Sequence, residues 1–319
     1  MVRHVLKKLI SVIPLLFIVS LILFIIIHML PGDVTLSLMG DTTDLEYMEK
    51  VRADLGVDKP LHEQYWSWLS NVLRGDLGRS MLTSREPVMD KVKIRLPVTL
   101  ELTILSILIS ILIAIPAGII SAVRRNSAFD TISRLISMIG IALPPFWIGI
   151  LLLLLFSVTL RWLPASGYVP FFQDPIANLK SMILPALSVG IAFAATVMRQ
   201  TRSAILDVLG QDYIMTARSK GLRERLILWK HALRNALIPV ITVISMQIGR
   251  LIGGSVVTEA VFSLPGMGRE IANSLLSRDY PVCIAMILIT AVFVVLVNTL
   301  VDVIVVFIDP RISRSAKTR

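Results

Sequence analysis

The sequence is poor in the residues that support disulfide, redox and metal chemistry. Its single cysteine, Cys283, excludes an intrachain disulfide and a thiolate cluster for a metal ion. The four histidines are scattered, and His62 with Glu63 fails the H-E-x-x-H zinc pattern because Trp66 stands where the second histidine is required. We therefore expect neither a metal site nor redox chemistry in this chain.

Charged residues are also scarce, at 17% of 319 residues, whereas 55% of the residues are hydrophobic. Soluble globular domains carry about 25% charged residues, so water is not the main solvent of this chain. A membrane helix needs about 20 mostly apolar residues. That criterion predicts an all-α multi-pass membrane protein with six transmembrane helices. The predicted spans are residues 9–30, 98–122, 135–160, 183–198, 236–257 and 282–308.

The net charge of +10 would suit a nucleic-acid partner if the basic residues clustered on a soluble domain. Instead they follow the predicted topology: 18 of the 32 Lys and Arg residues, but only 5 of the 22 acidic residues, fall in the N-terminus, residues 124–134, 199–234 and 309–319. Lysine and arginine are retained on the cytoplasmic side during insertion. We therefore expect both termini in the cytoplasm and no nucleic-acid partner.

This topology divides the chain into four parts. Residues 1–30 form the N-terminus and first span, and residues 31–97 form an extracytoplasmic subdomain. Residues 98–310 form a core of five spans that includes a cytoplasmic loop at 199–236, and residues 311–319 form a cytoplasmic tail.

One helix of the extracytoplasmic insert is predicted to be amphipathic. Apolar residues recur there at spacings of three and four: Leu61, Tyr65, Trp68, Leu69 and Val72. Such a face must be covered, and packing on the outer ends of the spans is a simpler explanation than a solute-binding site.

The cytoplasmic loop is too long for a plain turn and predicts two short helices, at 211–220 and 222–235. Gly221 is placed to end the first helix in the left-handed conformation, and Pro239 marks the entry into the next span. The first helix is expected to expose Tyr213, Ile214 and Ala217 and to seat in a groove on a soluble partner. A helix lying on anionic lipid fits the same residues.

Several segments resemble one family of transporters. They are DYIMTARSKGL at 212–222, HALRNALIP at 231–239, LGVDKPL at 55–61, GDLGRS at 75–80, RLPVTLEL at 95–102, VFSLPGMGR at 261–269 and DPRI at 309–312. Together they resemble the first permease subunit of the dipeptide, oligopeptide and nickel ABC importer family. Met215 and Thr216 depart from the Glu-Ala pair that opens the broader importer motif.

The resemblance implies a type I ABC importer permease fold in the bacterial inner membrane. The chain would form half of the translocation pathway for di- or oligopeptides, without catalytic residues of its own. Its implied partners are a second paralogous permease, two ABC ATPase subunits and an extracytoplasmic solute-binding protein. ATP and Mg would be bound by the ATPase subunits, because this sequence has no G-x-x-x-x-G-K-[ST] phosphate loop.

The resemblance also implies roles for individual residues. Coupling to the ATPase is implied for Asp212, Tyr213, Thr216, Ala217, Arg218 and Gly221. An outer gate or pathway is implied at Glu259, Phe262, Pro265, Gly266 and Gly268.

Two further expectations come from the residues themselves. Arg250 is also expected to belong to the outer gate or pathway. It lies inside a predicted span, about 20 Å from its cytoplasmic end, and a cation at such a position indicates a functional site. A direct pair of Arg250 with Asp302 is not expected, since Asp302 lies only about 9 Å from that end. Ser245, Gly249 and Gly253 share one face, which would pack against the second permease or, equally, within this chain.

Three alternatives remain open at this stage. The solute could be nickel or another small molecule, because nickel and peptide permeases look alike. A self-sufficient secondary transporter would usually show an inverted repeat, and none is clear. A membrane enzyme would need clustered nucleophiles or metal ligands within the spans, and the sequence shows none.

Overall fold

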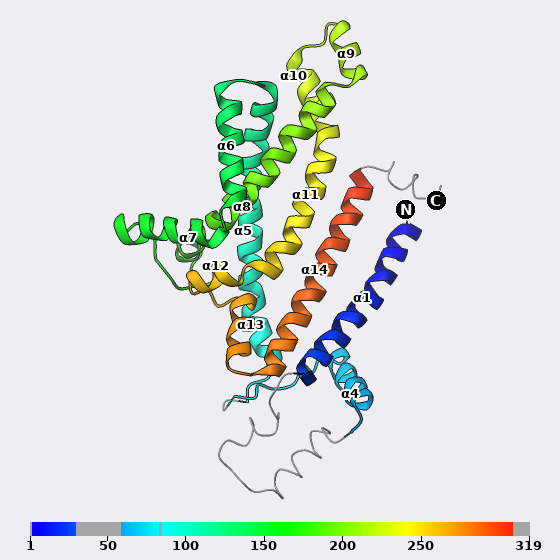
Figure 1. The fold of residues 1–319 in the computed structure, drawn as a ribbon, viewed down its shortest axis with the longest axis vertical. Coiled ribbons are helices and arrows are strands. Elements are labelled where there is room, and N and C mark those ends of the chain that lie inside the picture. The colour runs from blue at the N-terminus through cyan, green and yellow to red at the C-terminus, as the bar shows by residue number, and fades with distance from the viewer. Residues whose placement is uncertain (1, 30–58, 83–84, 309–319) are drawn as a thin grey trace, which may run out of the picture.

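The computed structural model describes residues 2–29, 59–82 and 85–308. Within these ranges the chain is built from helices, and the one β-type contact is an isolated bridge between Arg79 and Pro87. The predicted all-α class is therefore confirmed, and Figure 1 shows the helices as an elongated, open bundle. Residues 31–58 of the predicted insert and the predicted tail at 311–319 lie outside the described residues.

The long helices run roughly along the bundle and shorter ones connect them. The elements are α1 (Val2–Met29), α4 (Leu61–Leu73), α5 (Val88–Val123), α6 (Ala128–Ala142), α7 (Pro145–Leu153), α8 (Pro175–Leu209), α9 (Asp212–Ser219), α10 (Glu224–Leu226), α11 (Leu233–Gly254), α12 (Val256–Val261), α13 (Met267–Leu276) and α14 (Tyr280–Ile308). A π-helical turn, Leu154–Thr159, follows α7, and another, Ile227–Ala232, joins α10 to α11.

Four helices in the described ranges are long and apolar enough to cross a membrane: Val88–Val123, Pro175–Leu209, Glu224–Gly253 and Tyr280–Val301. The bent pair α6 and α7 would make a fifth span, and α1 holds a shorter apolar helix, Val12–Ile26. A multi-pass membrane fold is thus confirmed, and the count of six stays a prediction. At 36 residues α5 is about 54 Å long, so its ends extend beyond a hydrocarbon core of about 30 Å.

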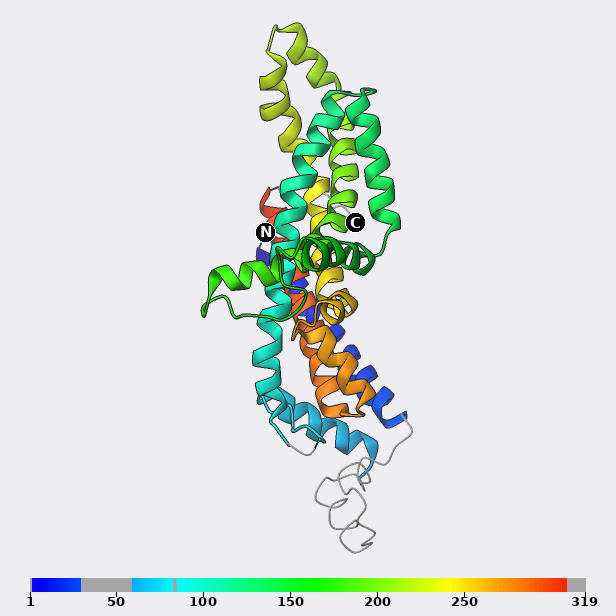
Figure 2. The same ribbon diagram turned by 90° about the vertical axis from the view of Figure 1, so that its left-hand side faces the viewer.

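The predicted span at 135–160 is not one helix, and its prolines mark the place where it breaks. The chain bends by 102° between Ala128–Ala142 and Pro145–Thr159. Leu143 leaves the helical conformation at ψ 130°, because Pro144 disfavours a helical residue before it and neither Pro144 nor Pro145 can donate a backbone hydrogen bond. As a result, α7 leaves the bundle sideways (Figure 2).

Two other predicted segments have different bounds. The predicted 183–198 span lies inside the much longer α8, which starts where the Asp174 carboxylate accepts hydrogen bonds from the backbone N–H groups of Ile176 and Ala177, both at 3.0 Å. The predicted helix at 222–235 and the predicted span at 236–257 form one helical run from Glu224 to Gly254, which the π-helical turn keeps unbroken. Pro239 lies within α11 rather than at its start.

The core is made mainly by α5, α8 and α11. Small apolar residues dominate it: Ala114, Ala122, Ala194, Ala204, Ala236 and Val240. Gly118 of α5 faces Thr201 and the carbonyl oxygen of Met198, where a Cβ atom would lie within 2.9 Å of both. This close approach holds α5 and α8 against each other along the bundle.

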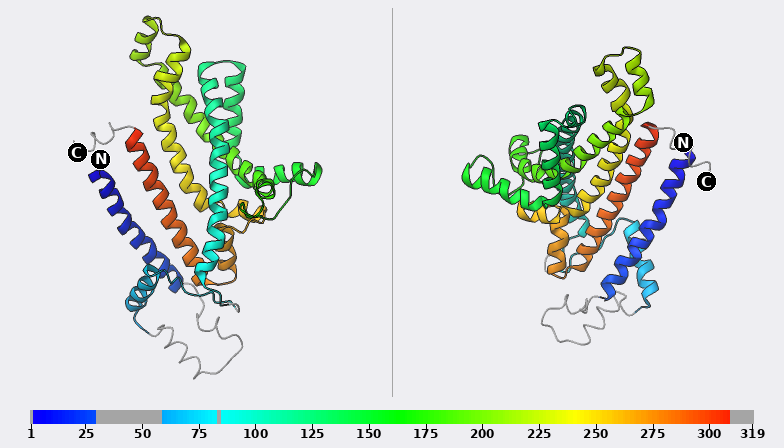
Figure 3. Two further views of the ribbon diagram at one scale, coloured as in Figure 1. Left: turned by 180° about the vertical axis from the view of Figure 1, so that it is seen from behind. Right: turned by 45° about the horizontal axis from the view of Figure 1, so that its top comes forward.

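The segment around α9 and the α5–α6 turn lie at one end of the bundle, and the start of α1 and the end of α14 point toward that end from lower down (Figures 1 and 3). We call it the hairpin end; α4 and α13 lie at the opposite end. There the apolar face predicted for α4 packs on α1, with the Tyr65 ring 5.8 Å from Phe17 and 5.3 Å from Phe24, centroid to centroid. The Tyr65 hydroxyl lies 2.9 Å from the Ser20 hydroxyl. Three of the four segments predicted to be cytoplasmic, the start of α1, the α5–α6 turn and residues 199–234, therefore lie toward the hairpin end, and the fourth, the tail, is outside the described residues.

Candidate functional site

The α9 hairpin, which we define as residues 210–232, projects beyond the α5–α6 turn at the hairpin end (Figure 1). Its first arm is α9, and the chain reverses at Gly221, where φ is +74°. Side chains rarely adopt this left-handed conformation, so glycine allows the turn at low cost. The predicted helix and its glycine stop are both confirmed.

The inner face of the α9 hairpin is apolar. Ile214 and Ile227 are 0% exposed and Ala217 is 7% exposed, and they pack against one another and against Val208 at the end of α8. The expectation that Ile214 and Ala217 are exposed is therefore wrong. They lie three residues apart on one face of α9, and the reversal at Gly221 folds Ile227 onto that face.

The outer face of α9 is mainly polar. Asp212, Tyr213, Thr216 and Arg218 are all exposed. The Tyr213 hydroxyl accepts a hydrogen bond from the Asn235 side-chain amide at 2.8 Å, and the Thr216 hydroxyl donates to the Asp212 carbonyl oxygen at 3.0 Å. Four of the six predicted coupling residues thus face outward, whereas Ala217 lies beneath them and Gly221 forms the turn.

An ion pair connects the two arms of the hairpin next to the turn at Gly221. Nε and Nη2 of Arg218 lie 2.7 and 3.3 Å from the two carboxylate oxygens of Glu224. The hydrogen bond to Glu224 raises the pKa of Arg218, so the guanidinium stays charged at physiological pH. The pair links the two arms on either side of Gly221; because both side chains are exposed, its contribution to stability is at most about 1 kcal/mol.

A buried ion pair near the α9 hairpin ties α8 to α6. Nε and Nη2 of Arg202 lie 2.7 and 2.9 Å from the carboxylate oxygens of Asp130, which is fully buried. The same carboxylate accepts hydrogen bonds from the Ser121 hydroxyl at 2.6 Å and from the Asn126 backbone N–H at 2.9 Å. Three helices, α5, α6 and α8, therefore meet at one carboxylate.

The sequence interpretation missed this pair, because it treated Arg202 and Asp130 only as loop charges. One local signal was present: Ser127 stands three residues before Asp130, a capping-box spacing, and its hydroxyl does accept from the Asp130 N–H at 3.2 Å. That spacing indicates a helix start and does not indicate an ion pair with α8.

At the other end of α11, Glu259 is also fully buried. Its carboxylate accepts hydrogen bonds from the hydroxyls of Thr99 and Ser255, both at 2.8 Å, and from the backbone N–H of Arg269 at 2.9 Å. The Thr99 hydroxyl in turn accepts from the Met267 N–H at 2.8 Å. Glu259 thereby satisfies the first turn of α13, where a negative charge is favoured, and joins α12 and α13 to α5.

The residues named for an outer gate surround this carboxylate. Gly266 lies so close to the Glu259 carboxylate that a Cβ atom would overlap it, and Gly268 lies against the backbone of Val256. Phe262 is 2% exposed in the cluster with Leu102 and Leu264. Pro265, which follows Leu264 in the chain, is half-buried. In this conformation the segment is a tightly packed junction of α5, α12 and α13.

A polar groove of about 640 Å³ lies on the side of the bundle between α11 and α14. Its lining residues are Thr242, Ser245, Met246, Gly249, Arg250, Val294 and Asn298. Gly249 approaches α14, since a Cβ atom there would lie 3.3 Å from the Asn298 amide nitrogen, whereas a Cβ atom at Gly253 would meet nothing within 4 Å. The small-residue face predicted at Ser245, Gly249 and Gly253 therefore packs within this chain at Gly249 and is open at Gly253.

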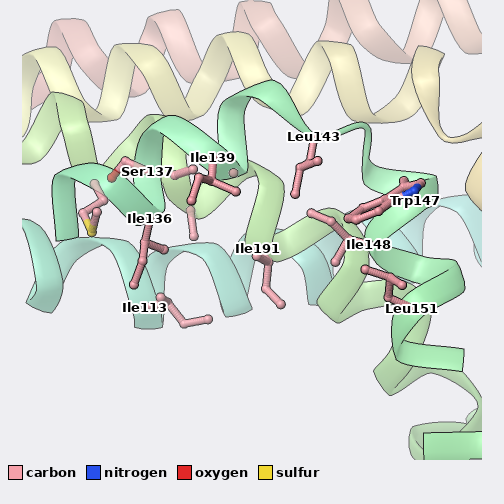
Figure 4. A pocket seen from close by; sticks show the side chains of 13 residues that line it. Ile113, Ile136, Ser137, Ile139, Leu143, Trp147, Ile148, Leu151 and Ile191 are labelled. Atoms are coloured by element: carbon pink, nitrogen blue, oxygen red, sulfur yellow. The ribbon is translucent and has the colours of Figure 1, made fainter. Parts of the chain in front are cut away.

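A second, apolar groove of about 340 Å³ lies inside the bend between α6 and α7 (Figure 4). Ile113 of α5, Ile139 of α6, Trp147 and Leu151 of α7 and Ile191 of α8 help to line it. Its walls are almost entirely hydrocarbon, as expected of a surface in contact with lipid chains or with another apolar helix.

These features define a class of protein: a multi-pass helical membrane protein with a helical hairpin at one end and a groove between two apolar helices. The comparisons identify its family. A model described as the binding-protein-dependent transport system inner membrane component matches residues 114–314, and the model of its N-terminal region matches residues 1–103. The chain belongs to this family, and it is a non-catalytic permease component of an ABC importer in the inner membrane.

Curated relatives match over nearly their full length. The glutathione transport system permease protein GsiC of Escherichia coli O6:H1 is 45% identical over 98% of this chain and 99% of its own. A relative of Brucella abortus, named provisionally as a peptide transport system permease protein, is 42% identical over the same shares. Among solved structures, the inward-facing MetNI methionine ABC transporter matches 70% of this chain and 98% of its own, with a TM-score of 0.56 and 19% identity. That likeness concerns the fold alone.

Proposed function

We propose that this chain forms half of the translocation pathway of an ATP-driven importer for small peptides and receives force from the ATPase through the α9 hairpin. The observation that carries the proposal is the two-faced construction of α9. Its outer face offers exposed polar side chains to a soluble partner, while Ile214 and Ala217 fix its inner face to the end of α8.

The proposed mechanism follows the contacts away from α9. Closure of an ATPase dimer displaces the hairpin, and the stiff reversal at Gly221 together with the Arg218–Glu224 pair prevents the hairpin from absorbing the displacement. The displacement reaches α8 through Val208, and the Arg202–Asp130 pair passes it to α5 and α6.

The complete transporter is proposed to contain a second, paralogous permease, two ABC ATPase subunits and an extracytoplasmic binding protein. The hairpin end would then face the cytoplasm, with both termini on that side, in agreement with the distribution of Lys and Arg. A peptide solute is favoured because one relative is named for glutathione, a tripeptide, and another for peptides.

The test is a cross-link followed by a transport assay. Thr216→Cys, on the exposed face, is expected to cross-link to the co-expressed ATPase, whereas Phe172→Cys, exposed in the loop before α8, is not. The complete complex in proteoliposomes, supplied with the binding protein, is expected to take up a labelled tripeptide only with ATP. Two results contradict the proposal. One is peptide uptake by this chain alone, driven by an ion gradient. The other is uptake of Ni²⁺ by the complex that added peptides do not inhibit.

A further inference from the structure

Arg250 lies at the mid-depth of the bundle. It lines the polar groove together with Val294, which is the middle residue of the 29-residue α14. Val294 is therefore about 21 Å from either end of that helix, further than half of a hydrocarbon core of about 30 Å. A cation at this depth is costly unless something compensates its charge, which makes it a mark of function.

None of the side chains that the structure describes compensates that charge. Arg202 is paired with Asp130 and Arg95 with Glu270, but Arg250 forms neither an ion pair nor a hydrogen bond with any of them. Its side chain is exposed to the groove. The guanidinium therefore presents its donors to whatever occupies the groove.

The other polar groups of the groove determine which ligand it suits. The hydroxyl hydrogens of Thr242 and Ser245 are already used, because they donate to the carbonyl oxygens of Ile238 and Ile241 at 3.1 and 2.6 Å. The Asn298 amide has no such partner in the described chain, and Gly249 leaves it uncovered. The free donors are thus the Arg250 guanidinium and the Asn298 amide, a pair that matches the two oxygens of a carboxylate.

We propose that the groove between α11 and α14 binds a carboxylate of the solute during translocation, with Arg250 as the charge partner and Asn298 as an additional donor. This proposal rests on the proposed function and adds a charge preference to it. For a small peptide, the carboxylate is the C-terminal group or an acidic side chain. A carboxylate of the second permease is the competing occupant, and the test separates the two.

The test measures the charge preference of the groove directly. Thr242→Cys places a thiol on the groove, and the buried Cys283 is the chain's only other cysteine. In the complete complex with cysteine-free partners, an anionic methanethiosulfonate is expected to react with this thiol about three to ten times faster than a cationic one, because the reagent approaches a fixed positive charge. Arg250→Gln is expected to abolish the preference, and Arg250→Lys to retain it.

A second measurement uses the solute itself. A tripeptide with a free C-terminus, trapped in the complex with vanadate, is expected to slow labelling of Thr242→Cys, and Arg250→Gln is expected to remove this protection. The matched control is Arg74→Gln, an exposed residue at the end of α4 and far from the α9 hairpin, which is expected to leave both the charge preference and the protection unchanged.

Three outcomes overturn the proposal. They are equal labelling rates for the two reagents, a preference that survives Arg250→Gln, and a preference that emerges only after an acidic residue of the second permease, or Asp302, is neutralised. The last outcome would show that Arg250 serves an ion pair between helices. The two proposals can fail separately. If the intact complex imports no peptide but the thiol still reacts faster with the anionic reagent, the proposed function is refuted, whereas the charge preference of the groove is supported.

Discussion

Arg202 and Asp130, 72 residues apart in the sequence, form a two-point ion pair with N–O distances of 2.7 and 2.9 Å. The Asp130 side chain is inaccessible to solvent, and the Arg202 side chain is 20% exposed. The pair lies where α8 leaves the bundle toward the α9 hairpin, and the Ser121 hydroxyl extends it to α5.

The first prediction concerns this pair. Arg202→Met is expected to lower the free energy of unfolding by about 3 kcal/mol, because it leaves the buried carboxylate with only the more distant Arg134, at 3.7 Å, as a counter-charge. The double variant Asp130→Asn with Arg202→Met is expected to recover part of the loss, since no uncompensated charge remains. Thermal unfolding of the purified chain in detergent measures both effects. A double variant no more stable than Arg202→Met would show that the pair is not the source of the loss.

The second prediction concerns Ala217 of α9, whose side chain packs against Ile227 in the second arm of the hairpin. Ala217→Leu is expected to push α9 away from the second arm at a cost of about 1–3 kcal/mol, the usual cost of overpacking. ATP hydrolysis by the complex should then continue while peptide uptake falls at least several-fold. The control is Met215→Leu, since Met215 is 56% exposed on the outer side of the same helix. Equal losses of uptake in the two variants would contradict the packing argument.

The third prediction uses the reversal of the hairpin. Gly221→Val places a β-branched side chain at φ +74°, which costs at least about 1–2 kcal/mol of backbone strain. Uptake per ATP hydrolysed is expected to fall. Gly210→Ala is the matched control in the same hairpin, because φ is −84° there and an added Cβ makes only ordinary contacts at 3.7 Å. If Gly221→Val transports normally, the stiff turn is unnecessary for coupling.

The fourth prediction concerns Glu259. Glu259→Gln replaces one accepting oxygen by an N–H₂ group that faces existing donors, so we expect a loss of about 1–3 kcal/mol in thermal unfolding experiments. Thr99→Val should be destabilising for the same reason, because it removes the hydroxyl that bridges Glu259 and the Met267 N–H. Ser277→Ala, whose hydroxyl bonds only within its own exposed helix end, serves as the control. A Glu259→Gln variant as stable as the wild type would refute the junction described for α5, α12 and α13.

Local features were predictable from the sequence where a few neighbouring residues decide them. The bounds of α9 and the left-handed Gly221 follow from one turn signal, and the apolar face of α4 follows from its periodicity. The break at Pro144 and Pro145 was equally local, because two prolines within a span indicate a hinge or a kink. The size of the bend, 102°, was not predictable, because hydropathy measures solvent preference and not helix geometry.

Other features depend on contacts between distant segments. Ile214 and Ala217 are buried because the chain reverses at Gly221 and packs Ile227 against them. Neither the periodicity of α9 nor the family motif contains that information. The burial of Asp130 and Glu259 depends on α8 and α5, from which 72 and 160 residues separate them in sequence. Single-sequence reasoning ranks such carboxylates as loop or gate residues because it cannot see which donors surround them.

The central claim is that the α9 hairpin and the α5–α6 turn move as one body when the ATPase closes. Spin labels at Ser219→Cys and Arg125→Cys, both exposed, allow the distance between these parts to be measured by pulsed electron resonance in the complete complex. The account predicts the same distance distribution with and without trapped ATP, while the distance from Ser219→Cys to a label on the second permease changes. The opposite result would contradict this claim: the distance between Ser219→Cys and Arg125→Cys changes when ATP is trapped, while the distance from Ser219→Cys to the second permease stays constant.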